Sequence, residues 1–328
     1  MPEHRFNPLR RQWVILAPDR AQRPNDYTAE TTEDRSACPF CPGNEEQTPP
    51  QIAIAPRIDD PKKWQVRVVP NRYPVLVDGE EAISPPPPLY SYRPAHGAHE
   101  VVVDSPEHEA TLASLKPFEG KQLLRVFGER LKALYERDDV RYAIVFKNFG
   151  AAAGASAAHP HTQIVGTTVL PPLIEQELAT QDLYWEENAR CLLCELVSEE
   201  ITAKTGVVTS TDEFIAFCPY ASRVNFEVWI TSIRHERDFF KLSNHEHESL
   251  ARLLIDVARR LEIVAKDLAY NLILHTPPPS DVAAEIQARH WRIEILPRTT
   301  GIAGLELGTG LFLSTVAPER AAETLRRL

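Results

Sequence analysis

The sequence predicts a protein of mixed helices and strands, and three observations support that fold class. Short stretches rich in valine, isoleucine and aromatic residues have the length and composition of strands. Two longer stretches carry apolar residues at helical spacing. The same order of elements then occurs twice along the chain. The expected strands cover residues 13–16, 65–69, 100–104, 141–148 and 270–274, and the expected helices cover 117–137 and 244–267.

The two helices are predicted from apolar residues that lie three and four positions apart. In the first helix such residues run from Leu123 to Leu134, and in the second from Leu250 to Val264. Side chains at this spacing share one face of a helix, so each helix should bury that face against the rest of the protein.

The second half of the chain repeats the first. The segments that align are 100–109 with 227–236, 142–146 with 270–274, and 159–163 with 290–294. The first of these alignments needs no gap, and an expected helix follows both of its copies. A tandem duplication accounts for this order, and we expect two domains, residues 1–175 and 176–328.

Length, charge and hydropathy restrict the class of protein. The chain has 328 residues, 43% of them hydrophobic and 25% charged, as is ordinary for a globular protein with a large core. A net charge of −10 argues against a nucleic-acid-binding surface, which is normally basic. No run of about 18 apolar residues predicts a membrane span, and the N-terminus lacks an apolar signal region. We therefore expect a cytoplasmic protein.

Cysteine and histidine occur in the same order in both halves. Each half has a Cys-x-x-Cys pair, one distant histidine and a second histidine at the start of an expected strand. The first set is Cys38, Cys41, His108 and His159, and the second set is Cys191, Cys194, His235 and His290. Two thiolates and two imidazoles suit tetrahedral structural zinc, whereas one Cys-x-x-Cys pair alone can be redox-active. The repetition favours two Zn²⁺ ions per chain, one in each half.

The segment from Gly154 to Gln163 has the features of a catalytic strand. Small residues precede two histidines one residue apart and leave room for a ligand near the backbone. Because side chains alternate along a strand, His159, His161 and Gln163 should point to one side, where a neutral imidazole suits nucleophilic chemistry on a phosphate. A solvated polar strand face is the alternative. The second half has Arg292 in place of His161, and arginine is no nucleophile near neutral pH, so only the first half should be catalytic.

Several motifs together resemble the galactose-1-phosphate uridylyltransferase family of the histidine-triad superfamily. They are Arg-x-Asn-Pro-x-x-x-x-Trp-Val, Pro-x-Arg20-x-x-Arg23-Pro, Cys38-Pro-Phe-Cys41, Ser-Pro-Glu-His108 and Gly-x-Ser156-x-x-His159-Pro160-His161-x-Gln163. The resemblance covers nearly the whole chain and implies an α+β fold. Each of two tandem histidine-triad-like domains would have an antiparallel sheet flanked by helices, and two chains would form a homodimer.

The resemblance also implies a ping-pong nucleotidyl transfer through His161. This imidazole would attack the α-phosphorus of UDP-glucose, release the sugar 1-phosphate and hold UMP until galactose 1-phosphate accepts it. The carbonyl group of Pro160 would orient the ring. Gln163 and Ser156 would donate hydrogen bonds to phosphoryl oxygens as negative charge builds on them.

Other residues match family positions that contact the substrate or the metal. Arg20 and Arg23 match phosphate-contacting arginines, and Asn71 and Asn148 match nucleotide-contacting asparagines. His159 would bind zinc and also anchor the strand that carries the nucleophile.

The C-terminal segment departs from the best-known uridylyltransferases. Residues 299–310 keep one glutamate of the family's sugar loop, Glu306, and lack the lysine and the glutamine that flank it there. This segment and the second cysteine pair resemble the family branch that includes ADP-glucose phosphorylase, in which phosphate attacks the adenylyl-histidine and releases ADP. Exchange between UDP-glucose and galactose 1-phosphate is the leading interpretation, and ADP-glucose phosphorylase or adenylyltransferase activity is the second. A zinc-stabilised nucleotide-binding protein without turnover is the alternative from another class.

Overall fold

The computed structural model describes residues 3–16, 38–77, 89, 95–265, 268–280 and 282–328. In these residues the strands are β1 (Glu3–Asn7), β2 (Gln12–Leu16), β3 (Ala53–Pro56), β4 (Trp64–Pro70), β5 (Gly97–Val103), β6 (Tyr142–Phe149), β7 (His161–Thr167), β8 (Val207–Ser210), β9 (Phe214–Phe217), β10 (Val228–Ser232), β11 (Tyr270–His275), β12 (Arg292–Pro297) and β13 (Phe312–Ser314). The α-helices of the same residues are α1 (Pro117–Tyr135), α2 (Pro172–Asn188), α3 (Leu192–Ala203), α4 (Asn244–Val264), α5 (Ala283–Ala288), α6 (Gly304–Thr309) and α7 (Pro318–Arg326).

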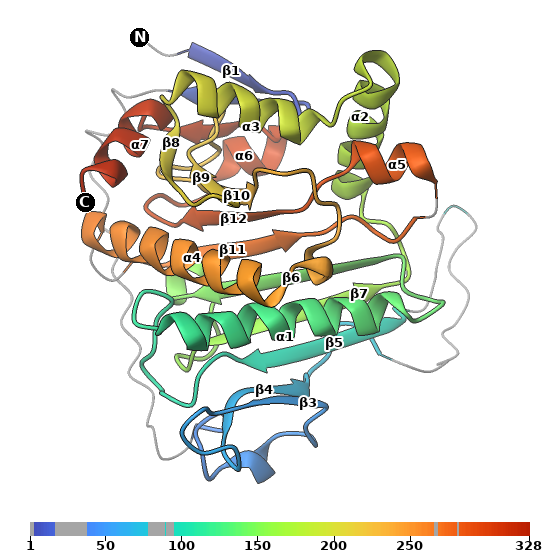
Figure 1. Cartoon of the computed structure of the whole chain (residues 1–328), viewed down its shortest axis with the longest axis vertical. Coiled ribbons are helices and arrows are strands. Elements are labelled where there is room, and N and C mark those ends of the chain that lie inside the picture. The colour runs from blue at the N-terminus through green and yellow to red at the C-terminus, as the bar shows by residue number, and fades with distance from the viewer. Residues whose placement is uncertain (1–2, 17–37, 78–88, 90–94, 266–267, 281) are drawn as a thin grey trace.

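A single antiparallel sheet crosses the whole molecule. Among the described residues it has ten strands in the order β3-β4-β5-β7-β6-β11-β12-β10-β9-β8 (Figure 1). Read from the outer edges inwards, the first half runs β3-β4-β5-β7-β6 and the second half runs β8-β9-β10-β12-β11, so the two halves have the same strand order. The expected combination of antiparallel strands and helices is confirmed. The expected boundary after residue 175 falls inside α2.

The two predicted helices are confirmed. Both α1 and α4 begin at the expected residues, and they end at Tyr135 and Val264. The start of α4 is fixed by a reciprocal pair of hydrogen bonds. The N–H of Glu246 donates to the hydroxyl of Ser243, and the N–H of Ser243 donates to the carboxylate of Glu246. The sequence analysis did not foresee α2 or α3, and α3 carries Cys194 of the second Cys/His set.

The two halves join where β6 pairs with β11. Phe146 lies directly opposite Ile273 in this pair. Phe146 is also the neighbour of Gln163 on β7, as Ile273 is the neighbour of Glu294 on β12. The residue equivalent to Phe146 is therefore Ile273, and the sequence alignment, which matched it to Leu274, was wrong by one residue here.

The same correction applies to β5 and β10. Gln163 lies opposite Val101, and Glu294 lies opposite Trp229, so Val101 and Trp229 are equivalent. The gapless alignment had matched Val101 to Val228. A shift of one residue in a strand moves every side chain to the other face, so the alignment alone predicts the wrong face for this strand.

The two faces of the sheet are covered differently. On one face α1 and α4 lie side by side (Figure 1) and pack on residues such as Val102 and Ile164. On the other face, the second half is covered by α3 and by the turn between β1 and β2, since Leu193 and Leu9 pack there against Trp229. The corresponding face of the first half carries a cleft.

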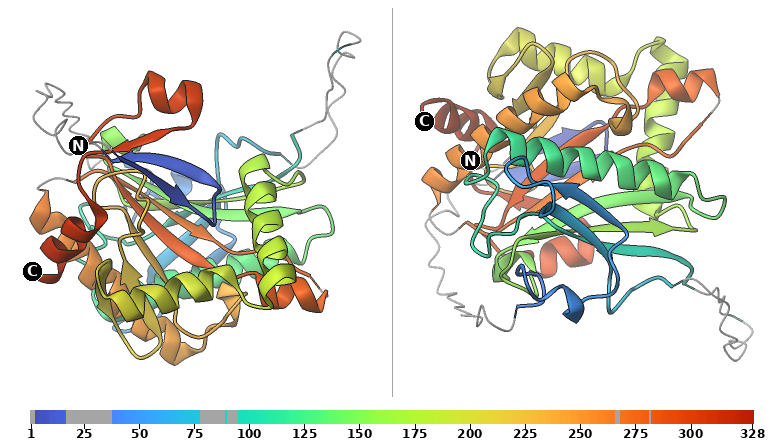
Figure 2. Two further views of the ribbon diagram at one scale, coloured as in Figure 1. Left: turned by 90° about the horizontal axis from the view of Figure 1, so that it is seen from above. Right: turned by 60° about the horizontal axis from the view of Figure 1, so that its bottom comes forward.

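The N-terminal and C-terminal segments lie together. β1 pairs with β2, and β13 pairs in parallel with β2, so the described residues of both ends form one small sheet (Figure 2). Arg5 on β1 forms an ion pair with Glu319 on α7 at 2.6 Å. This arrangement holds the N-terminal turn against the second half of the large sheet. No helix in the described residues has both the length and the apolarity that a membrane span requires.

Candidate active site

β7 brings two predicted catalytic side chains to the open face of the sheet. The strand lies between β5 and β6. Because its residues alternate between the two faces, Ile164 packs into the core, while His161 and Gln163 line the cleft. The strand begins at His161, so His159, which was expected to share it, lies just before its first residue. That position lets His159 turn towards the cysteines.

The ring of His161 is held by a backbone carbonyl group. Its Nδ1 lies 2.9 Å from the carbonyl oxygen of His159, which accepts the Nδ1–H hydrogen bond. The expectation that the Pro160 carbonyl orients the ring was wrong, because that carbonyl accepts a hydrogen bond from the N–H of Asp104 instead. A neutral imidazole that carries its proton on Nδ1 has its lone pair on Nε2. Nε2 is therefore the nucleophilic atom of this ring.

The cleft beside His161 is large enough for part of a nucleotide. Its volume is about 370 Å³, and its lining comes from residues within 39–49, 69–73 and 156–163 and from Val101 on β5. Ser156 and Asn71 line it together with His161 and Gln163, as expected for residues of one site. The ring of Phe40 lies 5.5 Å from the ring of His161, centre to centre, and forms a wall next to it.

Gln163 and Asn71 both approach a histidine that the sequence analysis did not single out. His99 is buried on β5, and its Nε2 lies 2.8 Å from Oε1 of Gln163 and 3.1 Å from Nδ2 of Asn71. The sequence offers no usable signal for His99, because only the strand pairing shows that Val101, two residues along on the same face, lies beside the cleft.

A buried ion pair lies beneath the start of β7. Nζ of Lys147 donates to Asp104 at 2.7 Å and to the carbonyl oxygen of His161 at 3.3 Å. The hydroxyl group of Thr162 donates to the same carboxylate at 3.0 Å. These contacts fix the backbone at the candidate nucleophile from the core side. The sequence offered no signal for the pair, since a lysine and an aspartate 43 positions apart carry no pattern.

The first Cys/His set comes together as expected. Cys38, Cys41, His108 and His159 place one ligand atom each within 4.8 Å of one another. Sγ of Cys41 lies 3.3 Å from Nδ1 of His108, and the two Nδ1 atoms of the histidines are 3.3 Å apart. Zn–S bonds of about 2.3 Å and Zn–N bonds of about 2.0–2.1 Å place tetrahedral ligand atoms roughly 3.3–3.8 Å apart, so the group fits zinc.

His159 links this group to the strand of the candidate nucleophile. Its Nε2–H donates to the carbonyl oxygen of Ser105 at 2.9 Å, which leaves Nδ1 to face the two thiols. Burial lowers the pKa of His159 to about 4, so the ring is neutral near pH 7, as a metal ligand must be. Because the carbonyl of the same residue holds the ring of His161, a metal bound here would fix the candidate nucleophile two residues away.

Other predicted substrate residues are placed differently. Asn148 lies on β6, where its Oδ1 accepts a hydrogen bond from Nδ2 of Asn271 on β11. Glu306 lies on α6, where its carboxylate accepts a hydrogen bond from the N–H of Ala303 in the first turn of its own helix, and it is not among the described residues that line the cleft. Arg20 and Arg23 lie outside the described residues.

The second Cys/His set comes together in part. Cys191, Cys194 and His235 place their ligand atoms within 4.8 Å of one another, and Sγ of Cys194 lies 3.4 Å from Nδ1 of His235. The ring nitrogens of His290 lie outside this group of described ligand atoms, so His290 as the fourth ligand stays a prediction. Its Nδ1 lies 2.8 Å from the carbonyl oxygen of Trp291, and its Nε2 lies 3.2 Å from that of Arg234.

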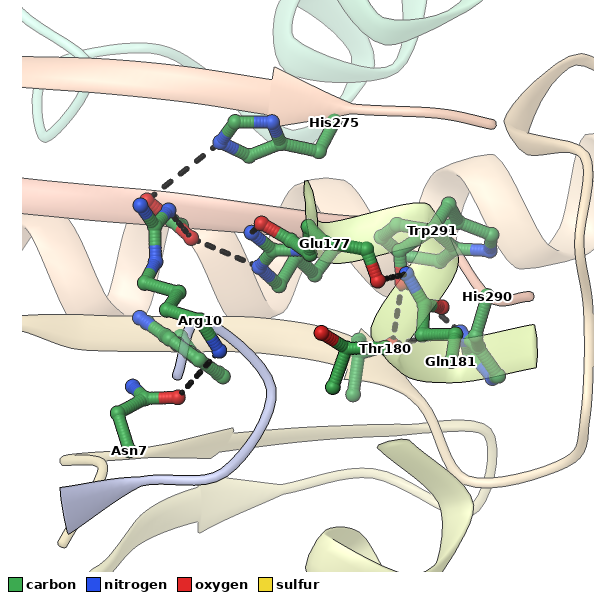
Figure 3. A network of polar contacts seen from close by, with 12 residues as sticks. Asn7, Arg10, Glu177, Thr180, Gln181, His275, His290 and Trp291 are labelled. Carbon is green, nitrogen blue, oxygen red and sulfur yellow. Dashed lines mark hydrogen bonds and ion pairs between the residues drawn. The ribbon is translucent and has the colours of Figure 1, made fainter. Parts of the chain in front are cut away.

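In the second half, the place of the candidate nucleophile is filled by a cluster of charges. Arg292 is 2% exposed and forms ion pairs with Glu294 on its own strand and with Glu177 on α2. Glu294 also pairs with Arg10 of the N-terminal turn and with Arg223. Figure 3 shows Arg10 and Glu177 within this network. The cluster thus binds α2 and the N-terminal turn to the face that is a cleft in the first half.

The charges of this cluster stabilise one another. Burial opposes ionisation of Glu294, but the guanidinium groups of Arg10, Arg223 and Arg292 lower its pKa well below the usual value. Burial likewise opposes ionisation of Glu177, and Arg292 lowers its pKa. Both carboxylates are therefore charged near pH 7, and the guanidinium group of Arg292 is no nucleophile there.

Comparison with known proteins identifies the family. The family model for the galactose-1-phosphate uridyl transferase N-terminal domain matches residues 1–171. The chain belongs to this family. A model for a domain of unknown function, DUF4921, matches residues 96–327. The resemblance expected from the sequence motifs is confirmed.

Two relatives of this family member bear the names of different activities. ADP-glucose phosphorylase of Arabidopsis thaliana is 32% identical over 100% of this chain and 93% of its own length. Galactose-1-phosphate uridylyltransferase of Thermotoga maritima is 28% identical over 99% of this chain and 98% of its own length.

Solved structures agree with the sequence comparisons. The Arabidopsis thaliana ADP-glucose phosphorylase with bound ADP-glucose has a TM-score of 0.86 at 31% identity, covering 100% of this chain and 99% of that one. A uridylyltransferase structure has a TM-score of 0.78 at 27% identity, and the match covers 100% of this chain and 98% of that one. The fold of nucleotidyl-transferring relatives therefore extends over the whole chain.

Proposed function

We propose that the protein is a nucleotidyltransferase that carries a nucleoside monophosphate on Nε2 of His161. The observation that supports this most directly is the geometry of that ring. His161 lines a cleft of about 370 Å³, its Nδ1–H is held by a carbonyl group, and Gln163 lies two residues along the same strand face. A ring held in one orientation with its lone pair towards a cleft is a prepared nucleophile.

The reaction takes place in two displacements. In the first, Nε2 of His161 forms a bond to the α-phosphorus of a nucleotide sugar, and the bond from that phosphorus to the bridging oxygen breaks, so that sugar 1-phosphate leaves. In the second, an oxygen of the acceptor attacks the same phosphorus and the P–N bond breaks, which regenerates the neutral ring. Donors from Gln163 and Ser156 stabilise the charge on the phosphoryl oxygens in both steps.

ADP-glucose is the donor that we propose first, with inorganic phosphate as the acceptor and ADP as the product. The similarity to the Arabidopsis thaliana ADP-glucose phosphorylase supports this choice, at 32% identity over the whole chain. The second candidate is UMP transfer between UDP-glucose and galactose 1-phosphate. The Thermotoga maritima uridylyltransferase, which is 28% identical, supports this candidate.

Zinc is the metal that we propose for both Cys/His groups. Thiolate and imidazole ligands favour this ion, and the separations in the first group agree with tetrahedral coordination. Cys38, Cys41, His108 and His159 would hold the first ion, which would supply rigidity rather than chemistry. In the second half, Cys191, Cys194 and His235 would hold the second ion, and a turn of the His290 ring would be needed for a fourth protein ligand.

We also propose a duplicated origin for the two halves. The shared strand order and the shared place of α1 and α4 support two histidine-triad-like domains, 1–175 and 176–328, that form one sheet. Assembly as a homodimer is a prediction carried by the family resemblance, and a cytoplasmic location is the expectation from the sequence. Analytical ultracentrifugation of the purified protein tests the first, and fractionation of cells tests the second.

The proposed reaction is tested by trapping the intermediate. The protein is incubated separately with ADP-glucose and with UDP-glucose, without acceptor, and is then analysed by intact mass and peptide mass spectrometry. We expect an acid-labile nucleotide on the peptide that contains His161, with release of glucose 1-phosphate. Addition of phosphate or of galactose 1-phosphate should then remove the nucleotide as ADP or as UDP-galactose.

The outcome distinguishes the candidate functions. Loading from ADP-glucose and unloading by phosphate would support phosphorylase activity, and loading from UDP-glucose alone would reject it. The His161→Ala variant is the control and should remain unloaded. Tight binding of nucleotide sugars without any loading would overturn the proposed transfer in favour of a binding protein.

A further inference from the structure

His99 lies next to the candidate catalytic residues without being one of those that line the cleft. It is 8% exposed and lies on β5 opposite Val165 of β7, while Val101, the next residue on the same face, lies opposite Gln163. His99 and Gln163 are therefore diagonal neighbours on adjacent strands, a distance that long side chains can bridge. Nε2 of His99 lies 2.8 Å from Oε1 of Gln163.

A backbone group determines which nitrogen of His99 carries the proton. The N–H of Val75 points at Nδ1 of His99, with a distance of 3.1 Å. A backbone N–H can only donate, so Nδ1 must accept and has no hydrogen. The neutral ring then carries its proton on Nε2. Two side-chain atoms lie near Nε2, namely Oε1 of Gln163 at 2.8 Å and Nδ2 of Asn71 at 3.1 Å. The amide nitrogen of Asn71 carries hydrogens and cannot accept, so Nε2–H of His99 donates to Oε1 of Gln163.

This hydrogen bond determines how the amide group of Gln163 is turned. An amide group has one oxygen, which accepts, and one NH₂ group, which donates. If His99 donates to the oxygen, the NH₂ group of Gln163 is the part presented to the cleft. The opposite orientation would present lone pairs to a negatively charged phosphoryl group and would repel it. The orientation of Gln163 therefore depends on the proton of His99.

The same histidine holds one wall of the cleft. The N–H of Asn71 donates to the carbonyl oxygen of His99 at 2.8 Å, and the N–H of Tyr73 donates to Oδ1 of Asn71 at 2.8 Å. With the hydrogen bond from Val75, these contacts fold residues 71–75 over the imidazole. His99 thus connects the wall of the cleft to the amide group of Gln163.

We propose that His99 is a positioning residue of the nucleotidyl transfer. By donating Nε2–H to Gln163, it keeps the NH₂ group of Gln163 aimed at the phosphoryl oxygens when His161 attacks. The inference rests on the proposed function, because it assigns to Gln163 a role in that reaction.

Two substitutions of His99 separate its two hydrogen bonds. The short side chain of His99→Asn keeps an acceptor near Nδ1 for Val75 and loses the donor to Gln163, whereas the longer His99→Gln places an NH₂ group near the position of Nε2. We expect His99→Asn to slow the loading of His161 by about tenfold to a hundredfold, below the roughly 10²–10³-fold cost of deleting a stabilising donor. His99→Gln should recover most of this rate, and both variants should bind the nucleotide sugar within a few fold of wild type.

A double-mutant cycle tests whether His99 acts through Gln163. In a Gln163→Ala background, His99→Asn should cause no further loss of the single-turnover loading rate, because the amide group that it orients is gone. Equal losses in both backgrounds would overturn the inference. So would a His99→Gln variant that is no faster than His99→Asn while both melt at the wild-type temperature.

A measurement without turnover separates this inference from the proposed function. ¹⁵N NMR of histidine-labelled protein reports which ring nitrogen is protonated, and the signal lost in His99→Asn identifies His99. We expect the Nε2–H form. The Nδ1–H form would overturn the inference even if the protein loads nucleotide. Failure of the wild-type protein to load any nucleotide would overturn the proposed function, and with it the catalytic part of this inference, whatever the NMR result.

Discussion

The two halves of the sheet share a strand order but differ in what covers their second face. In the first half His161 faces a cleft, and in the second half Arg292 takes the equivalent place and is enclosed by Glu177 and Glu294. A neutral imidazole can be held by one carbonyl group and still leave room beside it. A buried guanidinium group requires carboxylates, and these fill the space. At equivalent strand positions, His161 and Gln163 thus line a cleft, whereas Arg292 and Glu294 belong to a closed ionic cluster.

The largest expected effect is the loss of nucleotidyl transfer when the candidate nucleophile of the first half is replaced. His161→Ala should reduce nucleotidyl transfer by at least about a thousandfold, because the bond to phosphorus forms at this ring. Its melting temperature should stay close to that of wild type, since the ring lines a cleft. Steady-state assays with both nucleotide sugars and differential scanning fluorimetry measure the two quantities. If the His161→Ala variant still transferred nucleotide at a similar rate, His161 would not be the nucleophile that distinguishes the first half from the second.

The second prediction is that the two halves differ in how firmly they hold metal. Four described ligands converge in the first half and three in the second, so a chelator should remove the ion of the second half first. Cys38→Ser should lower the metal content by about one equivalent per chain and reduce the stability of the first half. Cys218→Ala is the matched control, because Cys218 is buried outside both groups and should leave the metal content unchanged. Elemental analysis by mass spectrometry during chelator titration measures the order of loss.

Removing Arg292 should test the ionic cluster. Arg292→Met leaves the buried carboxylates of Glu177 and Glu294 without one of their cations, which costs about 3–5 kcal/mol of unfolding free energy. Urea denaturation measures the loss. The double variant Arg292→Met with Glu177→Leu should regain part of it, because an unpaired charge is removed as well. Loading of His161 in the folded fraction should not change, and a large fall in loading would show that the second half takes part in the chemistry.

The smallest expected effect is on the acid stability of the cluster. The pKa of Glu177 is lowered below 4.5 because, although burial opposes ionisation, Arg292 favours the carboxylate. A carboxyl group of this kind stabilises the folded state above its unfolded pKa, and the contribution is lost as the pH falls from about 4.5 through the folded pKa. Glu177→Gln removes this titration. Its unfolding free energy should be below that of wild type near pH 7, and should change less between about pH 5 and pH 3. A parallel pH dependence in the two proteins would contradict the assignment.

The fold was predictable where the pattern is local or repeated. The spacing of apolar residues predicted α1 and α4 with correct first residues, and the repeated order of Cys and His predicted which side chains gather in the first half. The alignment of the two halves could not be predicted to within one residue. Val101 and Val102 are chemically alike, and only the hydrogen-bonded pairing of β5 with β7 shows that Val101 faces the cleft. α2 and α3 have no α-helix in the equivalent place among the described residues of the first half, so the repeat did not reveal them.

The candidate site was predictable in its chemistry and less so in its contacts. His161, Gln163, Ser156 and Asn71 were expected to share a site, and they line one cleft. The partners that orient them come from distant strands, as His99 does, and nothing in the sequence pairs them. His290 was expected to bind metal by analogy with the first half. In the structure its two ring nitrogens face backbone carbonyl groups of the second half, and the sequence repeat carries no information on how a ring is turned.

The junction between β6 and β11 gives the second half a structural role. Each of these strands completes the hydrogen bonding of the other along its length, from Ile144 with His275 to Phe149 with Tyr270. In a chain reduced to its first half, β6 would be an edge strand, and the N–H and C=O groups that now pair with β11 would be exposed. Such an edge recruits other chains and leads to aggregation. The second half thus covers an edge of the first half that would otherwise be open to other chains.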